Sequence, residues 1–130
     1  MTAFSLASAA AVAAGGALGS LLRYTVGLLM PHAPAGTAIP WATVGINVVG
    51  SLLLGTFAGL FVEGGGPGPA LRLFLTVGVL GGFTTFSTFS LDAVTLALAG
   101  QGARAALYVG ASVVGSLAAA AVGFSLARGG

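Results

Sequence analysis

Polar side chains recur at helical spacing in two apolar stretches of this sequence. Each stretch carries three of them, four residues apart: Thr43, Asn47 and Ser51 in the first, and Tyr108, Ser112 and Ser116 in the second. Residues four apart lie near one face of a helix, so each stretch would present a row of donors. A dehydrating anion needs such donors in place of water. The alternative is packing between helices, but packing does not need polar groups as large as those of Asn47 and Tyr108.

A third stretch combines aromatic rings with hydroxyl groups. Phe83, Phe86 and Phe89 recur at helical spacing, and the residues between them include Thr84, Thr85, Ser87 and Thr88. An aromatic stripe usually belongs to a hydrophobic core. The alternative is electrostatic, because a phenyl ring has a positive edge that can contact a small anion without a full positive charge. Such a weak contact suits conduction, since an ion that is held too tightly does not leave.

The composition decides where these residues must lie. The chain has 130 residues, of which 57% are hydrophobic and only 5% charged. Soluble domains carry about 25% charged residues, so a soluble fold is excluded, and disorder is excluded because disordered chains are polar. The chain is therefore expected to be an integral membrane protein in a cell membrane, with lipid as its solvent.

The same composition excludes most enzymes and nucleic-acid binding. The sequence has no Cys, which removes disulfides, Cys-ligated zinc, iron–sulfur clusters and thiol nucleophiles. A lone His32 cannot build a histidine-based metal site. Two carboxylates far apart in the sequence argue against a two-carboxylate hydrolase. A net charge of +2, scattered along the chain, is too small for a nucleic-acid footprint.

Four apolar runs are long enough to cross a bilayer, which needs roughly 20 residues. Gly/Pro-rich loops separate the runs, which cover residues 4–30, 41–62, 71–99 and 103–127 in a single domain. The third run is too long, because its 29 residues would make about 43 Å of helix against a core of roughly 30 Å. Gly81 and Gly82, followed by hydroxyl residues, predict a break near its middle. Such a break exposes backbone carbonyls that can hold an ion; the alternative is a kink for packing.

The few charges are divided evenly about the membrane. Four spans place Arg72 and Arg128 on the side of the chain ends, and Arg104 on the other side, joined by Arg23 if it reaches the interface. The positive-inside rule then favours neither orientation. We interpret this as dual topology with an antiparallel dimer, and the alternative is a weak bias in one direction. Arg23 could also act inside the membrane, and Asp92 could anchor at an interface or pair with an arginine.

Three motifs resemble those of one known family. They are GGALGSLLRY at residues 15–24, TVGINVVGS at residues 43–51 and GGFTTFSTFS at residues 81–90. In this order and spacing they resemble the signatures of the Fluc fluoride channels, also called CrcB-like proteins, and the third is close to diagnostic. The resemblance covers essentially the whole chain.

The resemblance implies an all-α antiparallel homodimer with two pathways that export fluoride passively down its electrochemical gradient. Phe86 and Phe89 match the family's pore phenylalanines, and Asn47 matches its pore asparagine. The resemblance also assigns Tyr108, Ser112, Ser116, Thr88 and Arg23 to the pathway. The role implied for Arg23 is either electrostatic, at the pore entry, or structural. Backbone carbonyls of Gly81 and Thr84 from both subunits would hold a structural Na+ on the dimer axis. Asp92 stands where the family often has Glu, which leaves the role of this acid open.

Two other functions are alternatives to a channel for a chain with four spans. A small multidrug exporter also has four spans and dual topology, but it needs an acid in the first span to exchange protons, and that span contains Arg23 and no Asp or Glu. A purely structural membrane subunit predicts no ion flux from the protein alone. The sequence does not decide between a homodimer and a pair with an oppositely oriented relative, although the even charge count favours the homodimer.

Overall fold

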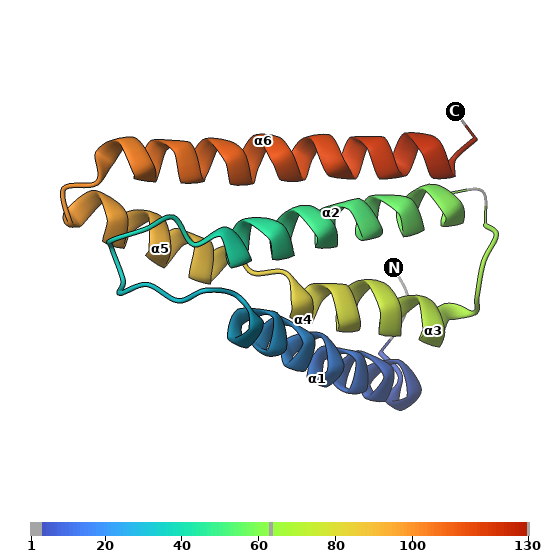
Figure 1. Ribbon diagram of the computed structural model, residues 1–130. Helices are drawn as coiled ribbons and strands as arrows, with labels where there is room; N and C mark the ends of the chain where they lie inside the picture. Colours follow the sequence, from blue (N-terminus) through green and yellow to red (C-terminus); the bar gives the residue numbers. More distant parts are fainter. Residues whose placement is uncertain (1–3, 63, 130) are drawn as a thin grey trace.

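The computed structural model describes residues 4–62 and 64–129, and within them the regular elements are all helical. Four of the helices are long: α1 (Leu6–Leu29), α2 (Trp41–Phe61), α5 (Phe86–Leu98) and α6 (Gly102–Ala127) (Figure 1). Three short elements precede α5 in one continuous stretch: α3 (Pro69–Leu73), the π-helix η1 (Phe74–Leu80) and α4 (Gly81–Phe83). Glu63, which belongs to the predicted loop after the second span, lies outside the described residues.

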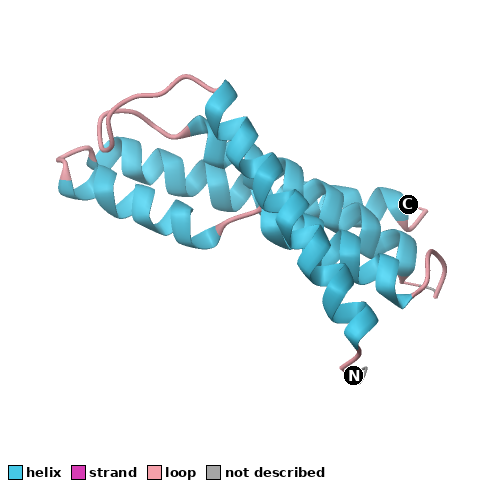
Figure 2. Ribbon diagram, turned by 90° about the horizontal axis from the view of Figure 1, so that it is seen from below, coloured by secondary structure: helices cyan, strands magenta, loops and turns pink. Residues whose placement is uncertain are grey.

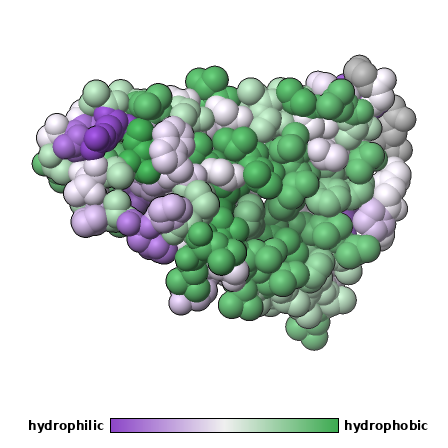
Figure 3. Space-filling view, viewed as in Figure 1, coloured by the Kyte–Doolittle hydropathy of each residue, from purple (hydrophilic) through white to green (hydrophobic). Residues whose placement is uncertain are grey.

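In the part of the chain that the structure describes, four helical segments are long and apolar enough to cross a membrane: Leu6–Leu29, Trp41–Phe61, Pro69–Leu98 and Gly102–Ala127. Four spans were predicted, and the helix ends lie within about two residues of the predicted runs. The start of α1 and the end of α6 lie at the same end of the bundle, as an even number of crossings requires (Figures 1 and 2). Apolar side chains cover most of the visible face, and hydrophilic ones gather at the end that carries the α1–α2 and α5–α6 loops (Figure 3).

The helices pack in two close pairs. α2 lies along α6, and α1 lies along η1 and α4, while α5 packs against α6. Glycines allow both close approaches: a Cβ on Gly19 would overlap the carbonyl oxygen of Val79, and a Cβ on Gly55 would overlap that of Ala120. Close approach at small residues of this kind is usual between membrane helices.

The third span is broken, as the Gly81-Gly82 pair predicted. α4 ends at Phe83 and α5 begins at Phe86, with Thr84 (φ −82°, ψ 158°) and Thr85 (φ −151°, ψ 122°) in extended backbone between them. Thr85 caps α5, because its hydroxyl accepts a hydrogen bond from the Thr88 N–H at 3.2 Å. The glycine pair itself remains helical, so the interruption lies just after it rather than at it.

Candidate functional site

A pocket of about 340 Å³ lies beside the break in the third span. Four segments line it, namely α2, the break, α5 and α6, with Asn47, Ser51, Thr84, Thr85, Phe86, Phe89, Ser112, Val113, Ser116 and Leu117. No charged side chain is among them. The pocket thus gathers hydroxyls, one amide and two phenyl rings from segments that are far apart in the sequence.

Six of the predicted site residues meet in this pocket: Asn47, Thr84, Phe86, Phe89, Ser112 and Ser116. Ser51 and Thr85 also line it, although neither was among the predicted site residues. A signal for both was present, because Ser51 continues the polar stripe of Asn47 and Thr85 lies in the hydroxyl-rich motif.

Two serines of α6 that line the pocket have hydroxyls without a hydrogen-bond partner among the described residues. Ser112, only 4% exposed, and Ser116 both have a buried Oγ without a hydrogen-bond partner among the described residues. Hydroxyls in helices commonly bond the carbonyl four residues earlier, as Thr56 does with Leu52 and Ser90 with Phe86. A buried hydroxyl without a partner is rare and calls for an explanation. Each of these serines therefore has a hydroxyl hydrogen that no described group accepts.

Asn47 holds the broken span in place. Its Nδ2 donates to the carbonyl oxygen of Thr85 at 2.9 Å, and its Oδ1 accepts from the Thr85 N–H at 2.8 Å. An amide has two N–H donors, so one N–H of Asn47 makes no hydrogen bond to the described residues. Asn47 therefore lines the pocket and also holds the backbone of the break.

The two phenylalanines of the pocket occupy different environments. Their ring centroids are 5.6 Å apart with planes at 57°. Phe89 is 8% exposed and belongs to a core cluster with Tyr108, while Phe86 is 79% exposed. A single chain therefore buries one ring and leaves the other on its surface, at the edge of the pocket.

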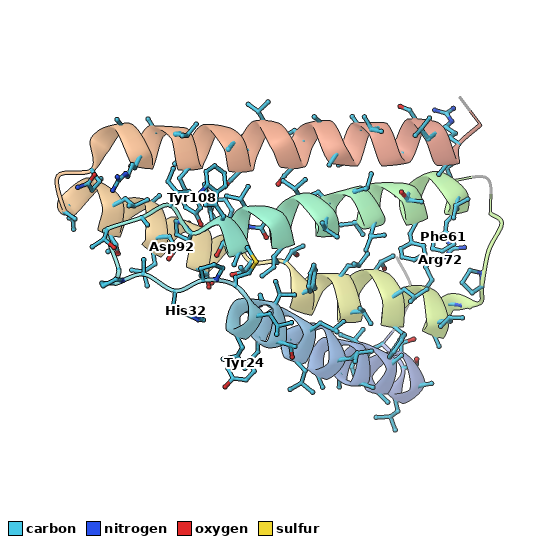
Figure 4. All side chains as sticks on the ribbon, viewed as in Figure 1. Tyr24, His32, Phe61, Arg72, Asp92 and Tyr108 are labelled. Carbon is cyan, nitrogen blue, oxygen red and sulfur yellow. The ribbon has the colours of Figure 1, made fainter. Side chains whose placement is uncertain are left out.

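Tyr108 lies behind the pocket rather than in its lining. The side chain is completely buried, and its ring packs on Phe89 with centroids 5.3 Å apart. Its hydroxyl donates to Oδ2 of Asp92 at 3.0 Å, and the Thr43 hydroxyl donates to the same oxygen at 3.4 Å. Figure 4 shows Tyr108 on α6 and Asp92 on α5 close to each other. In the described chain the polar partners of Asp92 are thus hydroxyls and not an arginine.

Two further predicted residues lie outside the pocket lining. Arg23 is half-buried, and its Nε donates to the carbonyl oxygen of Gly82 at 3.2 Å, directly before the break. Thr88 is exposed on the first turn of α5. The contact of Arg23 with the backbone agrees with the structural one of its two predicted roles.

The break redirects the donors that would otherwise bond the carbonyls of Gly81 and Thr84. In a continuous α-helix these oxygens would accept from the N–H groups four residues later. The Thr85 N–H instead donates to Asn47, and the Thr88 N–H donates to the Thr85 hydroxyl. Both predicted carbonyls thus lose their usual helical donors.

Comparisons with known proteins place this geometry in context. Residues 10–124 match the family described as "CrcB-like protein, Camphor Resistance (CrcB)". A relative from Rhodospirillum centenum, named a fluoride-specific ion channel, is 51% identical over 118 residues, which are 91% of this chain and 93% of the relative. A relative with the same name from Rhizobium meliloti is 50% identical, over 90% of this chain and 93% of its own length. A third, from Novosphingobium aromaticivorans, is 47% identical, over 95% of this chain and 98% of its own length.

Proposed function

The chain belongs to the CrcB-like family, and from this membership we propose that it is a fluoride-selective ion channel that exports fluoride passively down its electrochemical gradient. It is a multi-pass membrane protein and not an enzyme. The relatives that support this assignment share about half of their residues with the chain over nearly its whole length. The four apolar helices supply the membrane-spanning body that a channel requires.

The observation that carries the proposal is the pair of buried, unpartnered hydroxyls of Ser112 and Ser116 in a pocket without charged lining residues. Fluoride is small and tightly hydrated, so a pathway must replace its water with closely spaced donors. The two hydroxyls and the free N–H of Asn47 can donate. The edges of Phe86 and Phe89 add a weak positive field. With no fixed cation in the lining, the ion is not held so tightly that it fails to leave.

Two features support an antiparallel homodimer. Arg72 and Arg128 belong to the side of the chain ends and Arg104 to the other side, joined by Arg23 if it reaches the interface, so the count favours neither orientation. The Phe86 ring is 79% exposed at the edge of the pocket, so a second copy could cover it and complete the pathway. In such a dimer each pathway would be built on the α2, α5 and α6 of one chain and completed by the other chain, and the two pathways would run antiparallel.

The residues at the break fit a structural Na+. A hard cation prefers oxygen ligands, and the helical donors of the Gly81 and Thr84 carbonyls bond other groups. Two such carbonyls from each subunit would hold Na+ on the dimer axis. The bound cation would supply a positive local field. Asn47 and Arg23 fix the backbone on either side of Thr84 through Thr85 and Gly82, and so set the directions of these carbonyls.

Fluoride efflux from proteoliposomes tests the function. Purified protein is reconstituted into vesicles loaded with fluoride and chloride, and release is followed with ion-selective electrodes. Rapid loss of fluoride with chloride retained is the expected result. Absence of fluoride release, or equal release of both anions, would contradict the proposal. Tags at both chain ends, probed from each side of the membrane, test dual topology, and a single orientation would refute the antiparallel dimer.

A further inference from the structure

Gly50 of α2 faces the break in the third span. It lies three residues after Asn47, so both residues turn toward the same side of the helix, where the connection between α4 and α5 passes (Figure 1). A Cβ at Gly50 would overlap the Cγ2 methyl of Thr84, while the nearest atom of another residue, Cδ2 of Phe83, would be 3.4 Å away. Gly50 is buried. Its missing side chain thus leaves a seat on α2, which the Thr84 methyl fills.

The Thr84 side chain has little freedom to leave this seat. Its hydroxyl donates to the Leu80 carbonyl at 2.9 Å, and its backbone N–H donates to the same oxygen at 3.0 Å. Two heavy atoms on the Cβ of a threonine restrict its χ1 angle, so turning the methyl away from α2 would also break the hydroxyl bond. A side chain added at Gly50 must therefore either break this bond or displace the backbone at Thr84.

The contact one turn earlier on α2 sets the direction of the Thr84 carbonyl. The Thr85 N–H donates to Oδ1 of Asn47 at 2.8 Å. A planar trans peptide places its carbonyl opposite its N–H, and no peptide bond among the described residues is cis. The Thr84 carbonyl oxygen therefore points away from Oδ1 of Asn47. Asn47 holds one end of this peptide at Thr85, and the seat at Gly50 holds the other end at Thr84.

These contacts give Gly50 a role beyond close packing. We propose that Gly50 is a positioning residue for the Na+ site at the break, because the seat keeps the Thr84 carbonyl turned away from Asn47 and available as a ligand. This inference rests on the Na+ site proposed above. Gly45, the other glycine of the motif at residues 43–51, is exposed, and a Cβ there meets nothing within 4 Å. It therefore offers a matched control on the same helix.

Stabilisation by Na+ tests the inference without any measurement of fluoride conduction. A ligand that binds only the folded protein raises its stability once the ligand concentration exceeds the dissociation constant. The full-length protein in a neutral detergent is unfolded chemically at increasing NaCl, with N-methylglucamine chloride keeping the ionic strength constant. Gly50→Ala should raise the Na+ concentration at which stabilisation begins about tenfold. Gly45→Ala should leave that concentration unchanged.

Trimming Thr84 should rescue the Gly50 variant. Thr84→Ser keeps the hydroxyl and removes the methyl, so a Cβ at Gly50 would then meet only Cδ2 of Phe83 at 3.4 Å and Cβ of residue 84 at 3.7 Å. Alone, Thr84→Ser empties the seat and should weaken Na+ binding about threefold. Gly50→Ala added to Thr84→Ser refills the space and should restore binding to the parent level. A loss of Na+ affinity that one methyl group causes and the removal of another reverses would not follow from general loosening of the helices.

The outcomes separate this inference from the Na+ site itself. If Gly50→Ala lowers stability equally at every Na+ concentration, the glycine serves packing alone and the inference is refuted, although the Na+ site stands. If Na+ does not stabilise even the parent protein, the Na+ site is wrong and the inference fails with it. Should Gly50→Ala alone not assemble, the comparison of Thr84→Ser with the double variant decides. Weaker Na+ binding in the double variant than in Thr84→Ser would then refute the seat.

Discussion

Replacing Ser112 by alanine should stabilise the protein and impair fluoride conduction at the same time. The Ser112 hydroxyl is buried without a partner, and such a group destabilises the folded state by about 1–3 kcal/mol. Alanine removes the hydroxyl and leaves a space no larger than one oxygen atom. We therefore expect the free energy of unfolding to stay level or to rise by up to about 1 kcal/mol.

The effect of Ser112→Ala on conduction follows from the same hydroxyl. A hydrogen bond to a charged partner is worth about 1.5–3 kcal/mol. If the hydroxyl donates to fluoride during passage, its loss should slow conduction roughly tenfold or more. Fluoride efflux from proteoliposomes measures conduction, and chemical unfolding in detergent, followed by circular dichroism, measures stability. A gain in stability together with a loss of flux is the signature of a polar group kept for function.

Thr56→Val is the matched control for Ser112→Ala. The Thr56 hydroxyl donates to the Leu52 carbonyl at 2.8 Å and lies outside the pocket lining. Its removal should be neutral or slightly destabilising, and flux should remain at the parent level. The reasoning would be refuted if Ser112→Ala destabilised the protein and conducted fluoride normally.

Three further predictions concern the rings, the break and the cation. Phe86→Ile and Phe89→Ile should each reduce fluoride flux, because Ile keeps the bulk of the side chain and loses the ring edge. Size-exclusion chromatography should show that both variants remain dimers. Phe124→Ile, which lies outside the pocket, is the control and should conduct normally. Normal flux in both pocket variants would exclude the ring-edge contact. Asn47→Leu should lower the free energy of unfolding by about 2–3 kcal/mol and abolish flux, since both bonds to Thr85 are lost; unchanged stability in denaturant would contradict this role. Replacement of Na+ by a large organic cation throughout purification should reduce flux or dimer assembly, and full activity would argue against the axial site.

Composition and local spacing were enough to predict the membrane-spanning architecture of the molecule. The membrane environment follows from hydrophobicity, the four spans follow from the lengths of the apolar runs, and the broken third span follows from the Gly81-Gly82 pair. All three signals are read from the sequence without knowing which helices are neighbours. The close packing at Gly19 and Gly55 also has a local basis, since small residues on a helix face let two helix backbones approach closely. These features depend on local sequence and hardly at all on which helices are neighbours.

The use of the polar side chains was decided by tertiary contacts. Tyr108 and Ser112 share one face of α6, yet α5 supplies Asp92 to the Tyr108 hydroxyl and supplies no partner to Ser112. Asn47 lies 38 residues from Thr85 and Arg23 lies 59 residues from Gly82, but both side chains bond the backbone at the break.

The sequence by itself determined that lipid surrounds this protein, that the chain spans the membrane four times, and which types of polar group are available to an anion. Only the tertiary structure decided which of these groups face the pocket, which hold the broken helix, and which lie behind the aromatic rings. The physical reason is that a hydrogen bond depends on the distance between two atoms, and for these pairs that distance is set by how separate helices pack.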